Sequence, residues 1–323
     1  MFTFRASVIC TSIIFCLITL ASCAGLNTTT RPVKPATPAT PASAAPAPSP
    51  TVAHKPDITP ITTSVAPAHY TPHVFLRGVG RPDDLIFDQQ GSLLFSDPYN
   101  GTISRVNRNG SVTVILRGLA APEGLVVLRD GTLIIAEQQK HRILALAPGA
   151  PAPFVLHALP GIPSTAHCKD GVDGIALDPT NDTLIIPDSP TGEVYRMSRD
   201  GKLTLLASGI PRPVGAAVDA QGNVYLADEC GGSLWRIAPG GKPIRMANFG
   251  MLDDVVLDTH GNALVIDLKP SIHALIRMNL TTGKQETLAS RGFIEPQGLM
   301  IDAHDNIYVS DDYANVIMKY TPA

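Results

Sequence analysis

One pattern occurs six times along residues 82–311 and constrains the fold more than any other feature of the sequence. Each copy opens with a four-residue motif, continues through an alternating apolar segment to a polar turn, and ends a second apolar segment on an acid. The six openings are Pro82–Leu85, Pro122–Leu125, Val172–Ile175, Pro213–Ala216, Leu252–Val255 and Pro296–Leu299. The six closing acids are Asp97, Glu137, Asp188, Asp228, Asp267 and Asp311. These acids are 40, 51, 40, 39 and 44 residues apart, so one structural unit recurs along the chain.

Further strand-like segments follow each closing acid. Third strands are expected at Thr102–Val106, Arg142–Leu146, Glu193–Met197, Ser233–Ile237, Ala274–Met278 and Val316–Tyr320. Fourth strands follow in most units, for example at Val112–Leu116 and Leu203–Leu206. Four short strands in about 40 residues are typical of a β-propeller blade, so the sequence predicts an all-β, six-bladed propeller with four-stranded antiparallel blades.

The two ends of the repeat indicate how the ring closes. The sixth unit stops at Tyr320 without a fourth strand, and an unassigned strand, Tyr70–Leu76, precedes the first opening. We expect this N-terminal strand to become the outer strand of the last blade, because the pairing removes an exposed edge. Only the third unit carries a long insertion, around Pro160–Asp170. Residues 69–323 are therefore predicted to form one propeller domain.

The N-terminus has the composition of an export signal. Arg5 precedes an apolar run from Val8 to Leu20, which is too short to span a bilayer but suits the core of a signal peptide. The run ends in Leu20-Ala21-Ser22-Cys23, which resembles a bacterial lipobox. This predicts a lipoprotein signal at 1–22 and lipidation of Cys23, so that the protein is anchored to the cell membrane or outer membrane. The alternative is an ordinary secretory signal and a secreted protein.

Composition separates a tether from the domain and excludes one class of partner. Residues 31–68 contain ten prolines among Ala and Thr, so we expect 23–68 to be a disordered, lipid-anchored tether. The formal net charge is −3, which excludes a nucleic-acid binder driven by a basic surface. We expect a monomer that contacts the membrane only through its lipid.

Several units resemble known propeller families. The segment Pro296–Asp302 followed by Asn306–Asp311 resembles an NHL repeat, as does Pro213–Asp228. The third unit, Asp173–Ala176 with Asp188–Arg196, is more similar to the SMP-30/gluconolactonase family. The resemblance covers residues 70–323. It implies the propeller fold strongly and an activity only weakly, because propellers host many functions.

A variable set of residues is predicted to ring the mouth of the central channel. These are the second residues of the six openings: Asp83, Glu123, Asp173, Val214, Asp253 and Gln297. Converging carboxylates repel one another and raise each other's pKa unless a cation is bound. Such oxygen ligands suit Ca²⁺, Mg²⁺ or Mn²⁺. The alternative is a set of solvated carboxylates that hold no metal.

The family resemblance implies a metal at the same positions. Lactonases of the SMP-30 type bind one divalent metal through Glu, Asn, Asn and Asp at strand openings. Glu123 and Asp173 fall on positions of that type, and Asp83, Asp253 and Gln297 correspond by alignment of the repeat. This chain departs from the family pattern because none of its openings contains Asn.

A bound metal would allow hydrolysis of a lactone or ester. Asp173 or Asp253 is the candidate general base, and His167 or His141 the candidate assistant. The inserted loop, around Pro160–Asp170, is expected to act as a partial lid.

The closing acids and the two cysteines of the domain are predicted to be structural. An acid in every blade is expected to accept N–H groups from the turn that follows it. Cys168 lies in the insertion and Cys230 follows the closing acid Asp228, so we predict a disulfide between neighbouring blades. Two unpaired thiols are the alternative.

Three functions follow from these observations. The first is a metal-dependent hydrolase of a small lactone or ester, similar to the SMP-30/gluconolactonase family. The second is a non-catalytic, NHL-like propeller that binds an extracellular ligand or protein. The third is a lyase resembling virginiamycin B lyase.

Overall fold

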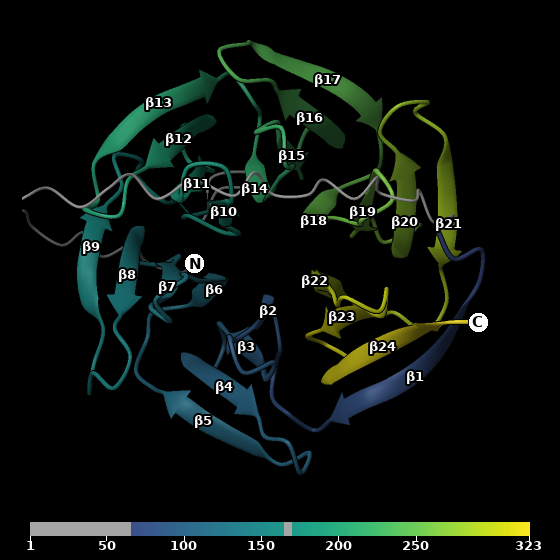
Figure 1. Cartoon of the computed structure of the whole chain (residues 1–323), viewed down its shortest axis with the longest axis horizontal. Coiled ribbons are helices and arrows are strands. Elements are labelled where there is room, and N and C mark those ends of the chain that lie inside the picture. Colours follow the sequence, from purple (N-terminus) through teal and green to yellow (C-terminus); the bar gives the residue numbers. More distant parts are fainter. Residues whose placement is uncertain (1–65, 165–169) are drawn as a thin grey trace, which may run out of the picture. The chain divides into compact units, whose positions relative to one another are not determined.

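The protein is an all-β ring of six blades. The computed structural model describes residues 66–164 and 170–323, and these form six four-stranded antiparallel sheets around a central channel (Figure 1). The predicted signal peptide, the lipidation site Cys23 and nearly all of the predicted tether lie outside the described residues. No helix in the described part of the chain is long and apolar enough to cross a membrane.

In each blade the four strands follow one another outward from the channel. The innermost strands are β2 (Leu85–Phe87), β6 (Pro122–Val127), β10 (Ala176–Asp178), β14 (Pro213–Val218), β18 (Leu252–Leu257) and β22 (Pro296–Ile301). The second strands are β3 (Leu93–Asp97), β7 (Leu133–Glu137), β11 (Thr183–Asp188), β15 (Val224–Asp228), β19 (Asn262–Asp267) and β23 (Ile307–Asp311). The third strands are β4 (Thr102–Val106), β8 (Arg142–Leu146), β12 (Glu193–Met197), β16 (Ser233–Ile237), β20 (Ala274–Asn279) and β24 (Val316–Pro322). The outer strands are β5 (Val112–Leu116), β9 (Phe154–Ala158), β13 (Leu203–Ser208), β17 (Pro243–Asn248), β21 (Gln285–Ala289) and β1 (Tyr70–Arg77).

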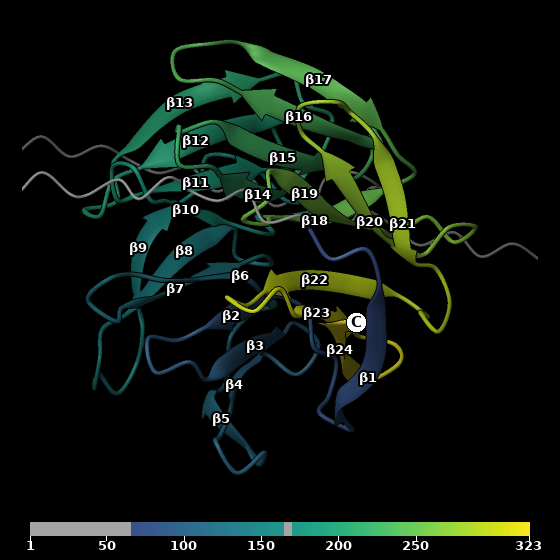
Figure 2. The ribbon, with the colours of Figure 1, turned by 45° about the vertical axis from the view of Figure 1, so that its right-hand side comes forward.

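The predicted closure of the ring is confirmed. Strand β1 pairs antiparallel with β24, from Tyr70 opposite Pro322 to Arg77 opposite Val316, and completes the sixth blade (Figures 1 and 2). We number the blades 1 to 6 from β2–β5 to β22–β24 with β1. The six openings and the loops after the closing acids lie on one face of the ring, which we call the opening face.

The hydrophobic core consists of layers between neighbouring blades. Alternate residues of the inner strands pack against the next blade, as in the cluster that joins Leu85 and Phe95 of blade 1 to Ile317 of blade 6. All three side chains are at most 2% exposed. Because burial runs around the whole ring, each blade is stabilised by both neighbours.

The closing acids have the structural role predicted for them. The carboxylate of Asp97 accepts the backbone N–H of Asn100 in the following turn at 2.8 Å, and that of Arg81 ahead of the inner strand at 3.0 Å. Asp267 likewise accepts the N–H groups of Met251 and Lys269, both at 3.0 Å. In these two blades the closing acid therefore ties the segment that enters the blade to the turn between its second and third strands.

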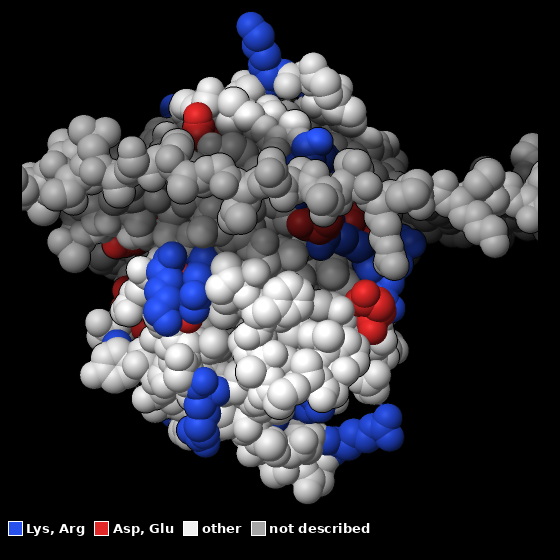
Figure 3. Space-filling view, turned by 90° about the vertical axis from the view of Figure 1, so that its left-hand side faces the viewer, with Lys and Arg blue, Asp and Glu red and all other residues white. Residues whose placement is uncertain are grey.

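The charged residues of the domain are sparse and mixed in sign. Lys, Arg, Asp and Glu together make up 16% of the sequence. Figure 3 shows blue and red side chains interspersed among uncharged ones on the uncovered part of one side of the molecule. No continuous basic surface is visible there.

Candidate functional site

Irregular pairing of the inner strands directs the opening residues toward the channel. In β6, Pro122 pairs with Glu137 and Leu125 pairs with Ile135, so two residues of β6 face one of β7. Strands β14, β18 and β22 are interrupted at the same point. Bulges of this kind bend a strand and re-aim its side chains. Strand β2 instead begins at Leu85, the last residue of its opening motif, and β10 begins at Ala176, one residue after its motif ends.

Four acids from four blades form the centre of the candidate site, which we call the carboxylate ring. They are Asp83, Glu123, Asp173 and Asp253. Glu123 is buried, and the other three are partly buried. Each interacts electrostatically with at least one other member of the ring. The structure therefore brings together the four acids that the repeat predicted.

Burial and mutual repulsion make these acids reluctant to ionise. Burial, then the nearby Asp173 carboxylate, raises the pKa of Asp83 to about 8. Burial also raises the pKa of Asp173 to about 6, although the positive charge of Arg212 opposes this. The pKa of Asp253 lies well above its ordinary value because of burial and then the charges of Asp173 and Asp83. At neutral pH the ring therefore holds protons that solvent-exposed carboxylates release.

Asp83 and Glu123 affect each other directly. The interaction between their side chains lowers the pKa of Asp83 and raises that of Glu123. Burial and the charge of Asp83 together hold the pKa of Glu123 well above its ordinary value.

The third residue of each opening motif lies where neighbouring inner strands approach closely. Two of these third residues are acids, and sequence reasoning missed them. Blades 2, 3, 4 and 6 have glycine at this point; a Cβ on Gly124 would lie 2.6 Å from the Asp173 carbonyl oxygen. Blades 1 and 5 have Asp84 and Asp254. Asp254 accepts the N–H of Leu299, in the next blade, at 2.9 Å. The sequence signal that could have revealed these two acids is that two openings have Asp where the other four have Gly.

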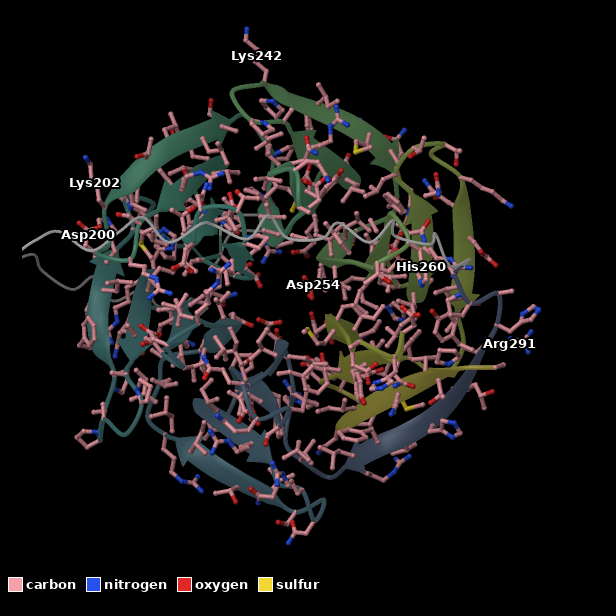
Figure 4. The ribbon with its side chains drawn as sticks, in the orientation of Figure 1. Asp200, Lys202, Lys242, Asp254, His260 and Arg291 are labelled. Atoms are coloured by element: carbon pink, nitrogen blue, oxygen red, sulfur yellow. The ribbon has the colours of Figure 1, made fainter. Side chains whose placement is uncertain are left out.

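The channel continues from the ring toward the opposite face as a cavity of about 220 Å³. Its lining is apolar except for Asp84 and Asp254. Figure 4 shows the labelled Asp254 at the channel. Burial, opposed by the hydrogen bonds from Val255 and Leu299, raises the pKa of Asp254 to about 7. Polar chemistry is therefore concentrated at the opening face.

Arg212 supplies positive charge at the edge of the ring, and sequence reasoning missed it. Its Nη2 lies 3.2 Å from Asp170 Oδ2 and 3.5 Å from Asp173 Oδ2, and its Nη1 pairs with Glu229. Arg212 is only 8% exposed. Arg212 stands two residues before Val214, which is the one apolar residue among the second residues of the six openings. This break in the pattern is the sequence signal that could have revealed Arg212.

The structure assigns His141 to the fold, contrary to the prediction that it assists catalysis. The side chain is 4% exposed. Its Nδ1 accepts the N–H of Val172 at 2.9 Å, and its Nε2 lies 3.3 Å from Asp188 Oδ1. Nε2 therefore carries the proton and faces the closing acid of blade 3. His141 joins blade 2 to blade 3.

The remaining predicted site residues have different outcomes. Gln297 lies in β22, partly buried, and Val214 is fully buried in β14. His167 and Cys168 lie outside the described residues. Cys230 is disulfide-bonded, which agrees with the predicted disulfide, while its pairing with Cys168 stays a prediction.

The donor chemistry of the ring matches a hard cation, but the side chains are not arranged around one. Four carboxylates without His or Cys are the ligands that Ca²⁺, Mg²⁺ and Mn²⁺ prefer. Among residues 66–164 and 170–323, no three His, Cys, Asp or Glu side chains converge closely enough to hold a metal. Cation binding by these residues would therefore require the carboxylates to lose protons and move together.

Comparison with known proteins supports the fold. No protein-family model matches the chain, and no curated protein matches its sequence. A gluconolactonase from Xanthomonas campestris superimposes with a TM-score of 0.65 at 14% identity, covering 80% of this chain and 91% of the other. Virginiamycin B lyase from Staphylococcus aureus gives 0.58 at 16% identity, over 73% and 79% of the two chains. An auxiliary nutrient-binding protein from Bacteroides thetaiotaomicron gives 0.62 at 15% identity, over 75% and 69%.

These similarities define the class of protein by its fold. The chain is a six-bladed β-propeller, a fold that it shares with proteins described as a lactonase, a lyase and a nutrient-binding protein. At such identities the likeness extends to architecture only, so function has to be argued from the site.

Proposed function

We propose that the protein binds a divalent cation at the carboxylate ring and hydrolyses a small lactone or ester there. One observation carries the proposal: four acids from four blades converge at the opening face, with pKa values raised by burial and by one another. Such a cluster is unfavourable when ionised unless a cation neutralises it. A bound divalent cation supplies polarisation of a carbonyl group and a lower pKa for bound water.

Residues of the opening face bind the cation in this proposal, and one of the ligands also acts as the base. Asp83, Glu123, Asp173 and Asp253 are the cation ligands, with Gln297 completing the mouth of the channel. Asp173 or Asp253 accepts the proton from the attacking water. The guanidinium of Arg212, 3.5 Å from Asp173, orients that carboxylate.

A non-catalytic binding propeller is the second candidate. Its support is that no described group of side chains is preformed around a metal, together with the likeness to a nutrient-binding protein. In this case the ring binds a cationic or polar extracellular ligand and holds no metal. A lyase is a third possibility, which rests on the fold shared with virginiamycin B lyase.

Addition of a divalent cation is expected to stabilise the protein if the ring binds it. A cation at a hundred times its dissociation constant adds about 2.7 kcal/mol, which raises the melting temperature by several degrees. Thermal unfolding after chelation, then with Ca²⁺, Mg²⁺ or Mn²⁺, measures this, and hydrolysis of gluconolactone is assayed in parallel.

Variants distinguish stabilisation by a cation bound at the carboxylate ring from a general effect of the cation on stability. Glu123→Gln and Asp173→Asn are expected to abolish the cation response. Asp311→Ala is the control, because that closing acid accepts backbone N–H groups and belongs to blade 6, which contributes no acid to the ring. It should lower the melting temperature and keep the response. If none of the three cations shifts unfolding, the hydrolase proposal fails and the binding propeller replaces it.

We also propose that the protein is exported and held on a membrane by lipid at Cys23. The lipobox-like segment Leu20–Cys23 motivates this. Expression in a bacterial host with radiolabelled palmitate is expected to label the protein, and Cys23→Ser should abolish labelling. Unlabelled wild-type protein in the medium would instead support the ordinary secretory signal.

A further inference from the structure

Two arginines occupy the same position of the repeat in opposite blades. Arg81 and Arg212 each stand directly before the first residue of an opening motif. Arg81 belongs to blade 1 and Arg212 to blade 4, which lie opposite each other in the ring (Figure 1). The backbone N–H of Arg81 donates to Asp97 Oδ2 at 3.0 Å, and that of Arg212 donates to Asp228 Oδ1 at 3.1 Å. Both acids are closing acids of the same blade. The two backbones are therefore placed alike, and differences between the side chains reflect their surroundings.

The charge of Arg212 is already neutralised inside the protein. Its guanidinium contacts three carboxylates, those of Asp170, Asp173 and Glu229. It is also nearly completely buried. Arg212 therefore has little capacity left to hold an anion from solution.

Arg81 has no such partner. Within the described residues its guanidinium makes neither an ion pair nor a hydrogen bond, and it lies instead between two tyrosine rings. The guanidinium carbon is 4.4 Å from the ring centroid of Tyr99 and 4.2 Å from that of Tyr313. Burial raises the pKa values of Glu295 and Asp312, and the charge of the nearby Arg81 opposes this rise. The N–H groups at the edge of the guanidinium remain available.

The two tyrosines are exposed in a way that favours binding over packing. Tyr99 is 74% exposed and Tyr313 is 55% exposed. Each stands two residues after a closing acid, Asp97 or Asp311, so both project from the opening face of adjacent blades. Stacking by both rings holds the guanidinium plane in one orientation. A fixed, planar fork of donors matches a planar acceptor with two oxygens.

We propose that Arg81, held between Tyr99 and Tyr313, is a carboxylate-binding subsite at the mouth of the channel. Arg81 is two residues from Asp83 of the carboxylate ring, and both belong to the segment that enters blade 1 on the opening face. Arg81 carries a positive charge on the opening face that no carboxylate pairs with in the described chain. The ligand of the site therefore carries a carboxylate in addition to the group that reaches the ring. This deepens the proposed function, because it names the class of ligand.

Binding of matched sugars tests the subsite without depending on the cation. Glucuronate, glucose and glucose 6-phosphate are titrated into the full-length protein by calorimetry at pH 7 with a chelator present. Glucuronate is expected to bind about tenfold more tightly than glucose, as one charge-assisted bidentate contact predicts. Arg81→Gln should remove this preference, and Tyr99→Leu with Tyr313→Leu should weaken it.

The control is Arg291→Gln, which removes the same charge from an exposed arginine that Figure 4 shows at the outer rim. It should bind glucuronate like the wild type. Arg81→Lys, which keeps the charge but not the fork, should retain only part of the preference. Thermal unfolding of each variant shows whether it is folded.

Three results would overturn the subsite: no binding of glucuronate in the millimolar range, equal binding of glucuronate and glucose, or an unchanged preference in Arg81→Gln. Tighter binding of glucose 6-phosphate than of glucuronate would overturn the assignment to a carboxylate. If the preference depends on Arg81 while no cation shifts unfolding, the subsite stands and the hydrolase proposal fails, so the two are separable.

Discussion

Replacing Arg212 with glutamine is expected to lower the free energy of unfolding by about 3–5 kcal/mol at pH 8, as removal of one partner from a buried ion pair does. Arg212 is 8% exposed and contacts Asp170, Asp173 and Glu229. Without it these carboxylates remain close together with no positive charge among them. Urea unfolding at pH 8 measures the loss.

The same variant should lose less stability at pH 5. Burial raises the pKa of Asp173 to about 6, and it also raises the pKa of Glu229. At pH 5 protons therefore replace part of the charge that Arg212 supplies. Arg81→Gln is the matched control, because it removes the same charge at the same repeat position from a side chain without an ion pair. An equal loss for Arg212→Gln at both pH values would contradict this account.

Without divalent cations, the wild-type protein is expected to become less stable as pH rises from 5 to 9. The pKa values of Asp173, Asp254 and Asp83 rise from an ordinary 3.8 to about 6, 7 and 8 in the folded protein. The folded state therefore holds protons that the unfolded state has released. This contribution is complete below pH 3.8 and is lost as pH rises through 6 to 8.

The size of this effect makes it measurable. One unit of pKa shift corresponds to about 1.4 kcal/mol, so the coupled cluster should lower the melting temperature by on the order of 10 °C across this range. Melting curves in a chelator at several pH values measure it. Asp253→Asn should flatten the dependence, because it removes one of the repelling charges. A wild-type stability that rises between pH 6 and 8 would contradict the raised pKa values.

Local sequence signals were sufficient to predict the blades. The third strands of blades 1 to 4 begin and end at the predicted residues, and Tyr70–Leu76 extends by one residue to Arg77. Alternating apolar residues between turn signals define such strands within a few residues of chain. The repeat then fixed their order, and each closing acid was found at the end of a second strand.

Contacts between blades were beyond the reach of these signals. The repeat placed Asp83, Glu123, Asp173 and Asp253 on one ring because they occupy one repeat position. Nothing in the spacing showed that Arg212 would reach back to Asp170 in the preceding blade. Nor did it show that His141 would contact Asp188 of the next blade. Such pairings depend on side-chain direction across an interface between two blades, which a local pattern does not record.

The strand that closes the ring also determines which way the site faces. Strand β1 enters at Tyr70, beside the C-terminal end of β24, and leaves at Arg77 on the opening face. The chain just before it is held by Arg277, whose Nη1 donates to the Pro67 carbonyl oxygen at 2.6 Å. The described chain therefore enters β1 on the side of the propeller opposite the carboxylate ring. The same strand ends on the opening face, where it leads directly into the segment that carries Arg81 and Asp83.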